Sequence, residues 1–186
     1  PLLSSPSPSP QNHKKQTPKN PALTYTPNVR TPQELNHNHK SVEWVIGLII
    51  SDNEAKSVNN ALRRRGFDVE VSRCVHWEIN VESDQERVLD KIKSSGELFN
   101  SNKEFIVDKN QGHDFSILVR QKDDVFGRAK HESLINRFNL NEISFIKRGV
   151  IWNVNYKSSN LQNEIESILT TNIFYNPNCY EYYRIN

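Results

Sequence analysis

The side chains best placed for chemistry or ligand binding are two tryptophans and two arginines that recur at one spacing. Arg73 lies four positions before Trp77, and Arg148 lies four positions before Trp152. Because a tryptophan buries a large apolar area, core packing is the first interpretation of both indoles. Ligand stacking is the second interpretation, since an exposed indole at the same position would hold a planar molecule.

No specific catalytic signature accompanies these residues. The sequence has no Walker loop, no Gly-x-Gly-x-x-Gly, no His-Glu-x-x-His and no Cys-x-x-Cys. We expect Cys74 to be a buried small residue at the end of an apolar stretch. We expect His76 to point outward into solvent and Cys179 to lie exposed in a loop. We therefore predict no catalytic residue and no metal site.

Two further groups have a structural and a functional interpretation. Arg63 to Arg65 close a predicted helix, where cations interact favourably with the helix dipole. Their alternative role is contact with a phosphate or a nucleic acid. His37 and His39 could bind a metal, but no third ligand lies nearby in sequence, so we interpret them as part of a polar tail.

The charge and the prolines divide the chain at about residue 40. Eight of the nine prolines lie in residues 1–32, and residues 1–40 carry a net charge of +4 against +2 for the whole chain. We predict that this Pro/Ser-rich segment is disordered, because it has too few large apolar residues to offset its chain entropy. The near-neutral total argues against a strongly charged nucleic-acid or membrane binder.

The start of the chain bears on its location. The sequence has no methionine, so we expect position 1 to arise from processing or from within a longer translation product. We expect a cytoplasmic location. An organelle is the alternative, since a Ser-rich and acid-poor start is compatible with the remnant of a transit peptide.

Short strands and helices alternate from residue 41 onward. Apolar residues recur with period two in the predicted strands and at helical spacing between them. Asp52 or Ser51 is a suitable cap for the first helix, and Gly66 and Gly96 suit helix ends. The predicted order is strand 42–50, helix 54–65, strands 67–74 and 75–81, helix 83–94, strand 105–107, strand 115–119, helix 127–138, strands 143–146 and 150–156, helix 161–169 and strand 180–185.

The same order and several of the same residues occur twice. The segment 75–80 matches 150–155 at an offset of 75, and Arg73 matches Arg148 at the same offset. We interpret this as a tandem duplication with halves 41–110 and 111–186. Each half has the order β-α-β-β-α-β, which predicts an α+β ferredoxin-like sandwich. We expect the open sheet faces of the two halves to pack together as an intramolecular pseudo-dimer.

The second half also carries a series of short motifs in a fixed order. Lys122 is followed by Gly127-Arg128-Ala129 and a helix, and the next strand carries Arg148-Gly149. A Leu-containing helix then leads to Asn176-Pro177 and to Glu181-Tyr182-Tyr183. In these motifs the second half resembles the PurS family, the small subunit of phosphoribosylformylglycinamidine (FGAM) synthase in purine biosynthesis. The sequence departs from the family in having Val125-Phe126 where Asp-Pro is usual, and the first half lacks both the Gly and the Pro.

The resemblance implies a bridging role without catalytic residues. A PurS-like pair joins a glutaminase subunit to an ATP-dependent synthetase subunit, or forms the start of a single-chain synthase. ATP, Mg and glutamine would then be used by the partners, and no cofactor would bind this chain. The residues that we predict to meet a partner are Arg73, Arg148, Asn176 and Pro177.

Two other classes stay open at this stage. A paired ACT-like regulatory module would bind a small ligand between its halves. A ferredoxin-like RNA-binding protein would stack bases on strand aromatics such as Trp152. The second half has Arg148-Gly149 before Trp152, but Val150 stands where a first stacking aromatic is expected, and nucleic acid is the less favoured partner.

Overall fold

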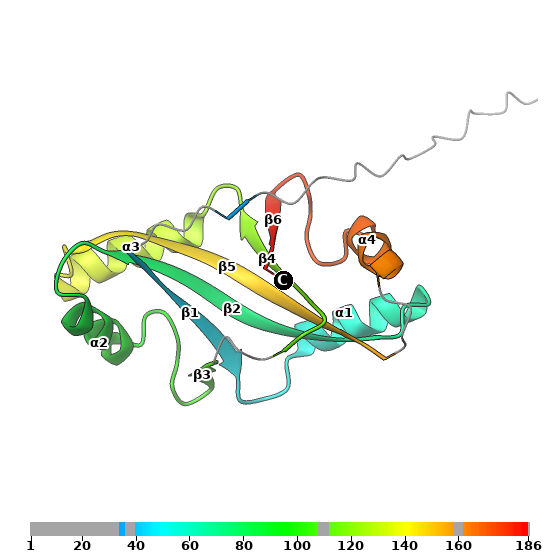
Figure 1. The fold of residues 1–186 in the computed structure, drawn as a ribbon. Helices are drawn as coiled ribbons and strands as arrows, with labels where there is room; N and C mark the ends of the chain where they lie inside the picture. Colours follow the sequence, from blue (N-terminus) through cyan, green and yellow to red (C-terminus); the bar gives the residue numbers. More distant parts are fainter. Residues whose placement is uncertain (1–33, 36–39, 108–111, 158–161, 186) are drawn as a thin grey trace, which may run out of the picture.

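The chain folds as an α+β structure with one six-stranded antiparallel sheet and four helices (Figure 1). The computed structural model describes residues 34–35, 40–107, 112–157 and 162–185. Along the sheet the strand order is β3-β1-β2-β5-β4-β6. The elements in chain order are β1 (Ser41–Leu48), α1 (Asn53–Arg64), β2 (Val69–Val81), α2 (Gln85–Ser95), β3 (Glu104–Ile106), β4 (Phe115–Gln121), α3 (Val125–Phe138), β5 (Ile143–Tyr156), α4 (Gln162–Thr170) and β6 (Tyr180–Arg184).

The two central strands are much longer than the others. β2 and β5 have 13 and 14 residues and run across the molecule side by side (Figure 1). The prediction of separate strands 67–74 and 75–81 is wrong, and so is the prediction of a break between 143–146 and 150–156. Neither junction contains an Asn-Gly or Asp-Gly pair that would favour a tight hairpin. Each strand continues without a turn, because its partner pairs with it along the whole length.

The register of the β2–β5 pair places repeat-related residues opposite one another. Val75 lies opposite Val150, the residue 75 positions later. Two residues away on either side, Arg73 lies opposite Trp152, and Trp77 lies opposite Arg148. The arginine of each segment therefore faces the tryptophan of the other.

Two hydrophobic cores lie on one face of this sheet, one toward each end of the long strands. The first core holds Trp77 of β2 and Ile146 of β5 with buried residues of α2 and α3. The second holds Val71 of β2 and Trp152 of β5 with buried residues of α1 and α4. Both cores thus combine elements from residues 41–107 with elements from residues 112–185.

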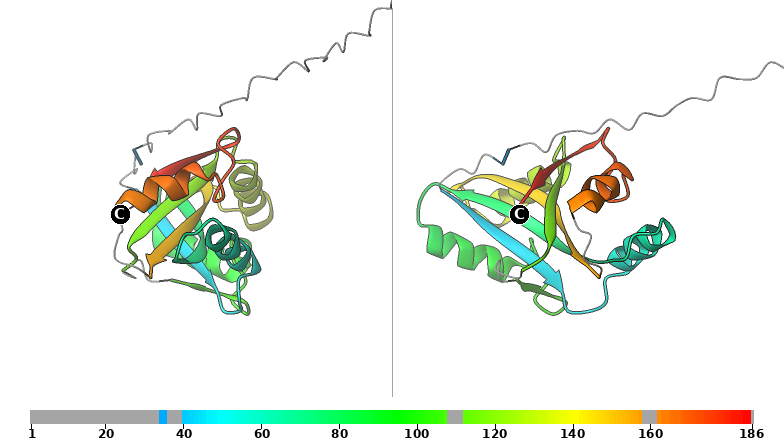
Figure 2. Two further views of the ribbon diagram at one scale, coloured as in Figure 1. Left: turned by 90° about the vertical axis from the view of Figure 1, so that its right-hand side faces the viewer. Right: turned by 45° about the vertical axis from the view of Figure 1, so that its right-hand side comes forward.

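The arrangement of the helices follows from these cores. In Figure 1 helices α2 and α3 lie at one end of the sheet and α1 and α4 at the other, and Figure 2 again places α1 beside α4 and α2 away from them. The expected stacking of two separate sheet faces is wrong. The halves instead join edge to edge through β2 and β5 in one continuous sheet.

The opposite face of the sheet, here called the helix-free face, is mostly polar and yet buried. Glu78 of β2 is 2% exposed and accepts a hydrogen bond of 2.7 Å from Arg120 of β4. His76 is also 2% exposed, so its expected exposure to solvent is wrong. Its Nε2 lies 3.7 Å from a carboxylate oxygen of Glu43. Residue alternation assigned His76 to the correct face of the strand but could not show that this face is covered.

Local signals at the helix ends agree with the structure. Asp52 caps α1 through hydrogen bonds from the amides of Glu54 and Ala55. Gly66 after α1 has φ +91°, and Gly96 after α2 has φ +68°, a region in which glycine meets no Cβ penalty. The three arginines 63–65 lie at the C-terminal end of α1 as expected.

Some predictions concern residues outside the described part of the chain. The segment 1–40, predicted to be disordered, is described only at residues 34, 35 and 40. His37 and His39 lie outside the described residues. Leu35 is partly buried against a small cluster formed by Val45, Leu118 and Ile151 on the helix-free face. Of the helices in the described residues, none is long and apolar enough to cross a membrane.

Candidate functional site: a cavity between two arginines

A cavity of about 330 Å³ lies over the middle of the β2–β5 pair, on the face that carries the helices. It brings together the two arginines that sequence analysis predicted to meet a partner, since Arg73 and Arg148 both line it. Each of them is two residues from the Val75–Val150 pair at the centre of the ladder. The other lining residues come from both halves of the chain: Glu54, Val119, Gln121, Asp124, Phe126, Gly149, Val150, Trp152, Phe174, Tyr175 and Tyr180.

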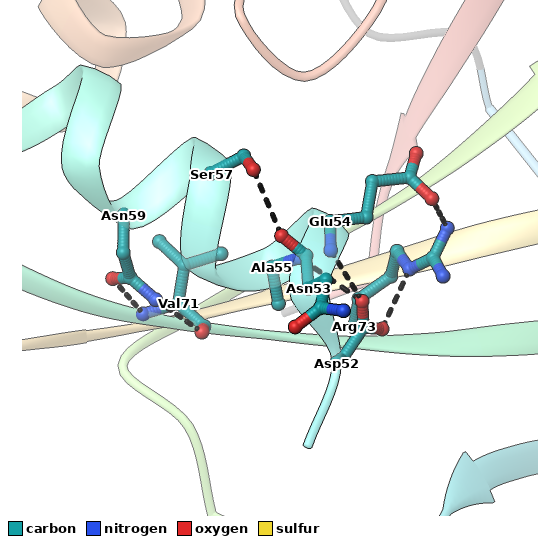
Figure 3. Close-up of polar contacts among 8 residues, drawn as sticks. All are labelled: Asp52, Asn53, Glu54, Ala55, Ser57, Asn59, Val71 and Arg73. Atoms are coloured by element: carbon teal, nitrogen blue, oxygen red, sulfur yellow. Dashed lines mark hydrogen bonds and ion pairs between the residues drawn. The ribbon is translucent and has the colours of Figure 1, made fainter. Parts of the chain in front are cut away.

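Arg73 is held by carboxylates at the start of α1. Its Nε donates a hydrogen bond of 2.8 Å to Asp52, and its Nη1 pairs with Glu54 (Figure 3). Its guanidinium carbon also lies 5.9 Å from the centre of the Trp152 ring. Burial by itself would raise the pKa of Asp52, but the hydrogen bonds from Arg73 and from the amides of Ala55 and Glu54 outweigh it and lower that pKa.

Arg148 has a different environment. Its guanidinium carbon lies 6.0 Å from the centre of the Trp77 ring and 5.3 Å from that of Phe126. Within the described residues, no carboxylate lies within ion-pair distance of this guanidinium. Burial lowers the pKa of Arg148, and the positive charge of Arg73 lowers it further. The group remains cationic at neutral pH, because an arginine starts from a very high pKa.

Asp124 lines the cavity together with Arg148. Both of its carboxylate oxygens accept hydrogen bonds from backbone amides. Oδ1 accepts from the amide of Gly127 at 2.9 Å and so caps α3. Oδ2 accepts from the amide of Arg148 at 2.8 Å. Gly127 is required at this turn, because a Cβ there would lie 2.1 Å from Oδ2 of Asp124 and 2.6 Å from the carbonyl oxygen of Ile146.

Aromatic side chains form much of the cavity lining. Trp152 and Phe174 pack with ring centres 5.4 Å apart, and Tyr175 packs on Tyr182 at 5.2 Å. Phe126 is 61% exposed and also lines the cavity. The cavity therefore combines arginine side chains with aromatic rings, a combination found in sites for small organic anions.

The two repeated tryptophans are not equivalent with respect to this site. Both are buried, which confirms core packing as their first role. Trp77 donates its Nε1 hydrogen to the carbonyl oxygen of Leu98 in the first core, whereas Trp152 lines the cavity. Trp152 is on the face that carries the helices, so it does not offer the open sheet surface on which a ferredoxin-like RNA-binding domain stacks bases.

The predicted partner-binding residues Asn176 and Pro177 lie in the loop between α4 and β6. The Asn176 carbonyl accepts hydrogen bonds from the amides of Cys179 and Tyr180, and the Pro177 carbonyl accepts one of 3.1 Å from Nζ of Lys122. Tyr180, at the end of this loop, lines the cavity. The loop is thus held beside the cavity, and its contact with a partner stays a prediction.

The cysteines do not contribute to this site. Cys74 is half-buried on the helix-free face, and burial raises its pKa, an effect that the charge of Asp52 reinforces. A raised pKa reduces the thiolate fraction at neutral pH, as expected of a structural cysteine. Cys179 is exposed, as predicted. No group of three His, Cys, Asp or Glu residues in the described part of the chain could hold a metal ion.

Sequence analysis missed several residues of the cavity. Asp124, Phe126, Phe174 and Tyr180 come from loops and element ends that only the fold brings together. Of these, Asp124 could have been found from the sequence, because Asp directly before a helix is a preferred N-cap residue.

Comparison of the chain with protein-family models and with curated proteins finds no match.

Proposed function

We propose that this chain is a non-catalytic bridging component of FGAM synthase, built as a PurS-like tandem duplication. The observation that carries the proposal is the register of the central ladder. An offset of 75 between repeats was inferred from residues alone, and Val75 pairs with Val150. Two duplicated segments related by a local two-fold axis would have this register, because an antiparallel pair places equivalent residues opposite each other at the axis.

The division of the cores supports the same proposal. In a ferredoxin-like sandwich the second and third strands form separate elements of one unit. Here the second strand of one half continues into the core at the other end, so that the two ferredoxin-like units exchange strands and helices. Exchange of identical elements between subunits is a known route to intertwined dimers, and a duplicated chain can make the same exchange within itself.

An intertwined pair is suited to bridging. It has two related ends, one formed by α1 and α4 and the other by α2 and α3 (Figure 1). One end would contact the glutaminase and the other the ATP-dependent synthetase. ATP, Mg and glutamine would be used by those partners in the cytoplasm, and this chain would hold their relative position for ammonia transfer.

The proposal is tested by affinity capture with the full chain as bait in lysate of the source cell, followed by mass spectrometry. We expect recovery of an FGAM synthetase and a class I glutaminase. The matched variant is Asn176→Ala with Pro177→Ala, which alters the predicted partner loop. Glu70→Gln is the control, at an exposed position of β2 on the helix-free face. Capture of neither enzyme by a folded wild-type chain would contradict the proposal.

A regulatory ligand-binding module is the second candidate. The observation in its favour is the cavity between the halves, where an ACT-like pair would also hold its ligand. A module of this kind gains thermal stability from its ligand, whereas a purely bridging component does not.

A further inference from the structure

The cavity contains an arginine, Arg148, that forms an ion pair with no carboxylate of the described residues. Arg73 pairs with Asp52 and Glu54, whereas the guanidinium of Arg148 contacts the rings of Trp77 and Phe126. A cation removed from water is stabilised by a hydrogen-bonded anion.

The remaining lining limits the charge of a ligand. Asp124 and Glu54 also face the cavity, so the four charged residues that line it sum to zero. A ligand with several separate anionic groups would be repelled by these carboxylates. A single anionic group is therefore the best match for Arg148, the lining arginine that pairs with no carboxylate of the described residues.

The apolar wall limits the shape of a ligand. The rings of Trp152 and Phe174, which pack on each other, line the cavity. Val119 of β4 and Val150 of β5 line it on the side of the sheet. A volume of about 330 Å³ is at the small end of the range for organic ligands. A planar body of one or two rings would fit, and a dinucleotide would not.

We propose that this cavity binds a small organic anion, whose carboxylate or phosphate-ester head is held by Arg148 and whose planar body packs on Trp152. The exposed Phe126, which contacts Arg148, lies at the opening and would cover the bound head group. The inference goes beyond the bridging role, because that role assigns no ligand to this chain.

The test uses the full chain and three probes of similar shape: phenylacetate, phenyl phosphate and the neutral phenylacetamide. Binding is measured by thermal shift and by tryptophan fluorescence. We expect saturable binding of phenylacetate, phenyl phosphate or both, and at least tenfold weaker binding of phenylacetamide. Preference between the two anions distinguishes a carboxylate ligand from a phosphate ester.

Variants separate the cavity from general charge effects. Arg148→Met should weaken anion binding at least tenfold, and Arg148→Lys should retain part of it. Arg137→Met is the matched control, because Arg137 also lies over an aromatic ring, Phe138, but outside the cavity. The proposal is overturned if the anions bind no better than phenylacetamide, or if Arg148→Met and Arg148→Lys both bind them as well as wild type. These outcomes do not depend on partner capture, so this proposal and the bridging role can fail separately.

Discussion

The two arginines at the centre of the sheet have the same backbone position and opposite surroundings. Arg73 and Arg148 each lie across the ladder from a tryptophan, with the guanidinium about 6 Å from the facing ring. Arg73 is nevertheless bound by two carboxylates, and Arg148 by none in the described chain. Two arginines at matching positions of one ladder can therefore differ, one in ion pairs with carboxylates and the other against aromatic rings.

The difference arises at the start of two helices, α1 and α3. They follow β1 and β4, the strands on either side of the central pair. Oδ1 of Asp52 accepts both capping amides of α1, which leaves Oδ2 for the side chain of Arg73. Asp124 uses one oxygen for the amide of Gly127 and the other for the backbone amide of Arg148. The capping carboxylate accepts a hydrogen bond from the side chain of one arginine, Arg73, and from the backbone amide of the other, Arg148. This difference determines whether the guanidinium is paired with the cap.

The largest expected effect comes from separating the two regions altogether. Fragments cut within residues 108–111 each lack part of both cores, because α2 packs with α3 and α1 with α4. We expect neither fragment to fold as a monomer, and mixing them to restore a 1:1 complex with cooperative unfolding. Circular dichroism and light scattering provide the measurement. A folded monomeric fragment would show that the halves do not share their cores.

A smaller effect is expected from exchanging the residues at the start of the two helices. Gly127→Ala should destabilise the protein by about 1–3 kcal/mol, because the added Cβ would meet a backbone oxygen that cannot easily move. Ala55→Gly, at the capped amide of α1, should cost only about 1 kcal/mol through helix propensity. Urea unfolding of both variants gives the comparison, with Gly112→Ala as a control in open space.

A Gly127→Ala variant as stable as wild type would contradict the close approach of α3 to the carbonyl oxygen of Ile146 in β5.

Removal of each arginine sharpens the comparison directly. Arg73→Met should reduce the free energy of unfolding by about 1.5–3 kcal/mol, the usual range for hydrogen bonds to charged groups. Arg148→Met should reduce it by only about 0.5–1 kcal/mol, since no ion pair is lost and only the contacts with the rings of Trp77 and Phe126 are removed. Thermal or urea unfolding at neutral pH measures both. Equal losses in the two variants would contradict the different environments of the two arginines.

The smallest effect concerns the pH dependence of the interaction between Asp52 and Arg73. The pKa of Asp52 is lowered in the folded protein, so its contribution to stability is present above its ordinary pKa of 3.8 and is lost as the pH falls further. Asp52→Asn keeps a cap. It removes the charged partner of Arg73 and should therefore cost about 1 kcal/mol at pH 7. We expect this difference from wild type to shrink at pH 3 in urea unfolding. A cost that does not change with pH would contradict a charged interaction with Arg73.

Much of the fold could be predicted from sequence, because its signals are local. The helix between Asp52 and Gly66 has a cap, an apolar face and a terminating glycine within a few residues of each other. The continuity of β2 could not be predicted, because a break after Cys74 and a straight run have the same alternation of side chains. The choice depends on whether a partner strand pairs across positions 74 and 75, and that partner lies 75 residues away.

The cavity was predictable only in part. The repeat indicated that Arg73 and Arg148 belong together, and they do line one cavity. The repeat also hid the difference between them, since it depends on how Asp52 and Asp124 distribute their hydrogen bonds. His76 illustrates the same limit, because a period of two gives the face of a side chain but not what covers that face.

The bridging role is tested most directly by reconstitution of FGAM synthesis with the synthetase and glutaminase of the same cell. A bridging component is needed to deliver ammonia from glutamine, but not when ammonia is supplied in solution. We therefore predict that omission of this chain abolishes glutamine-dependent synthesis and leaves ammonia-dependent synthesis unchanged. Glutamine-dependent synthesis at the same rate with and without the chain would contradict the account.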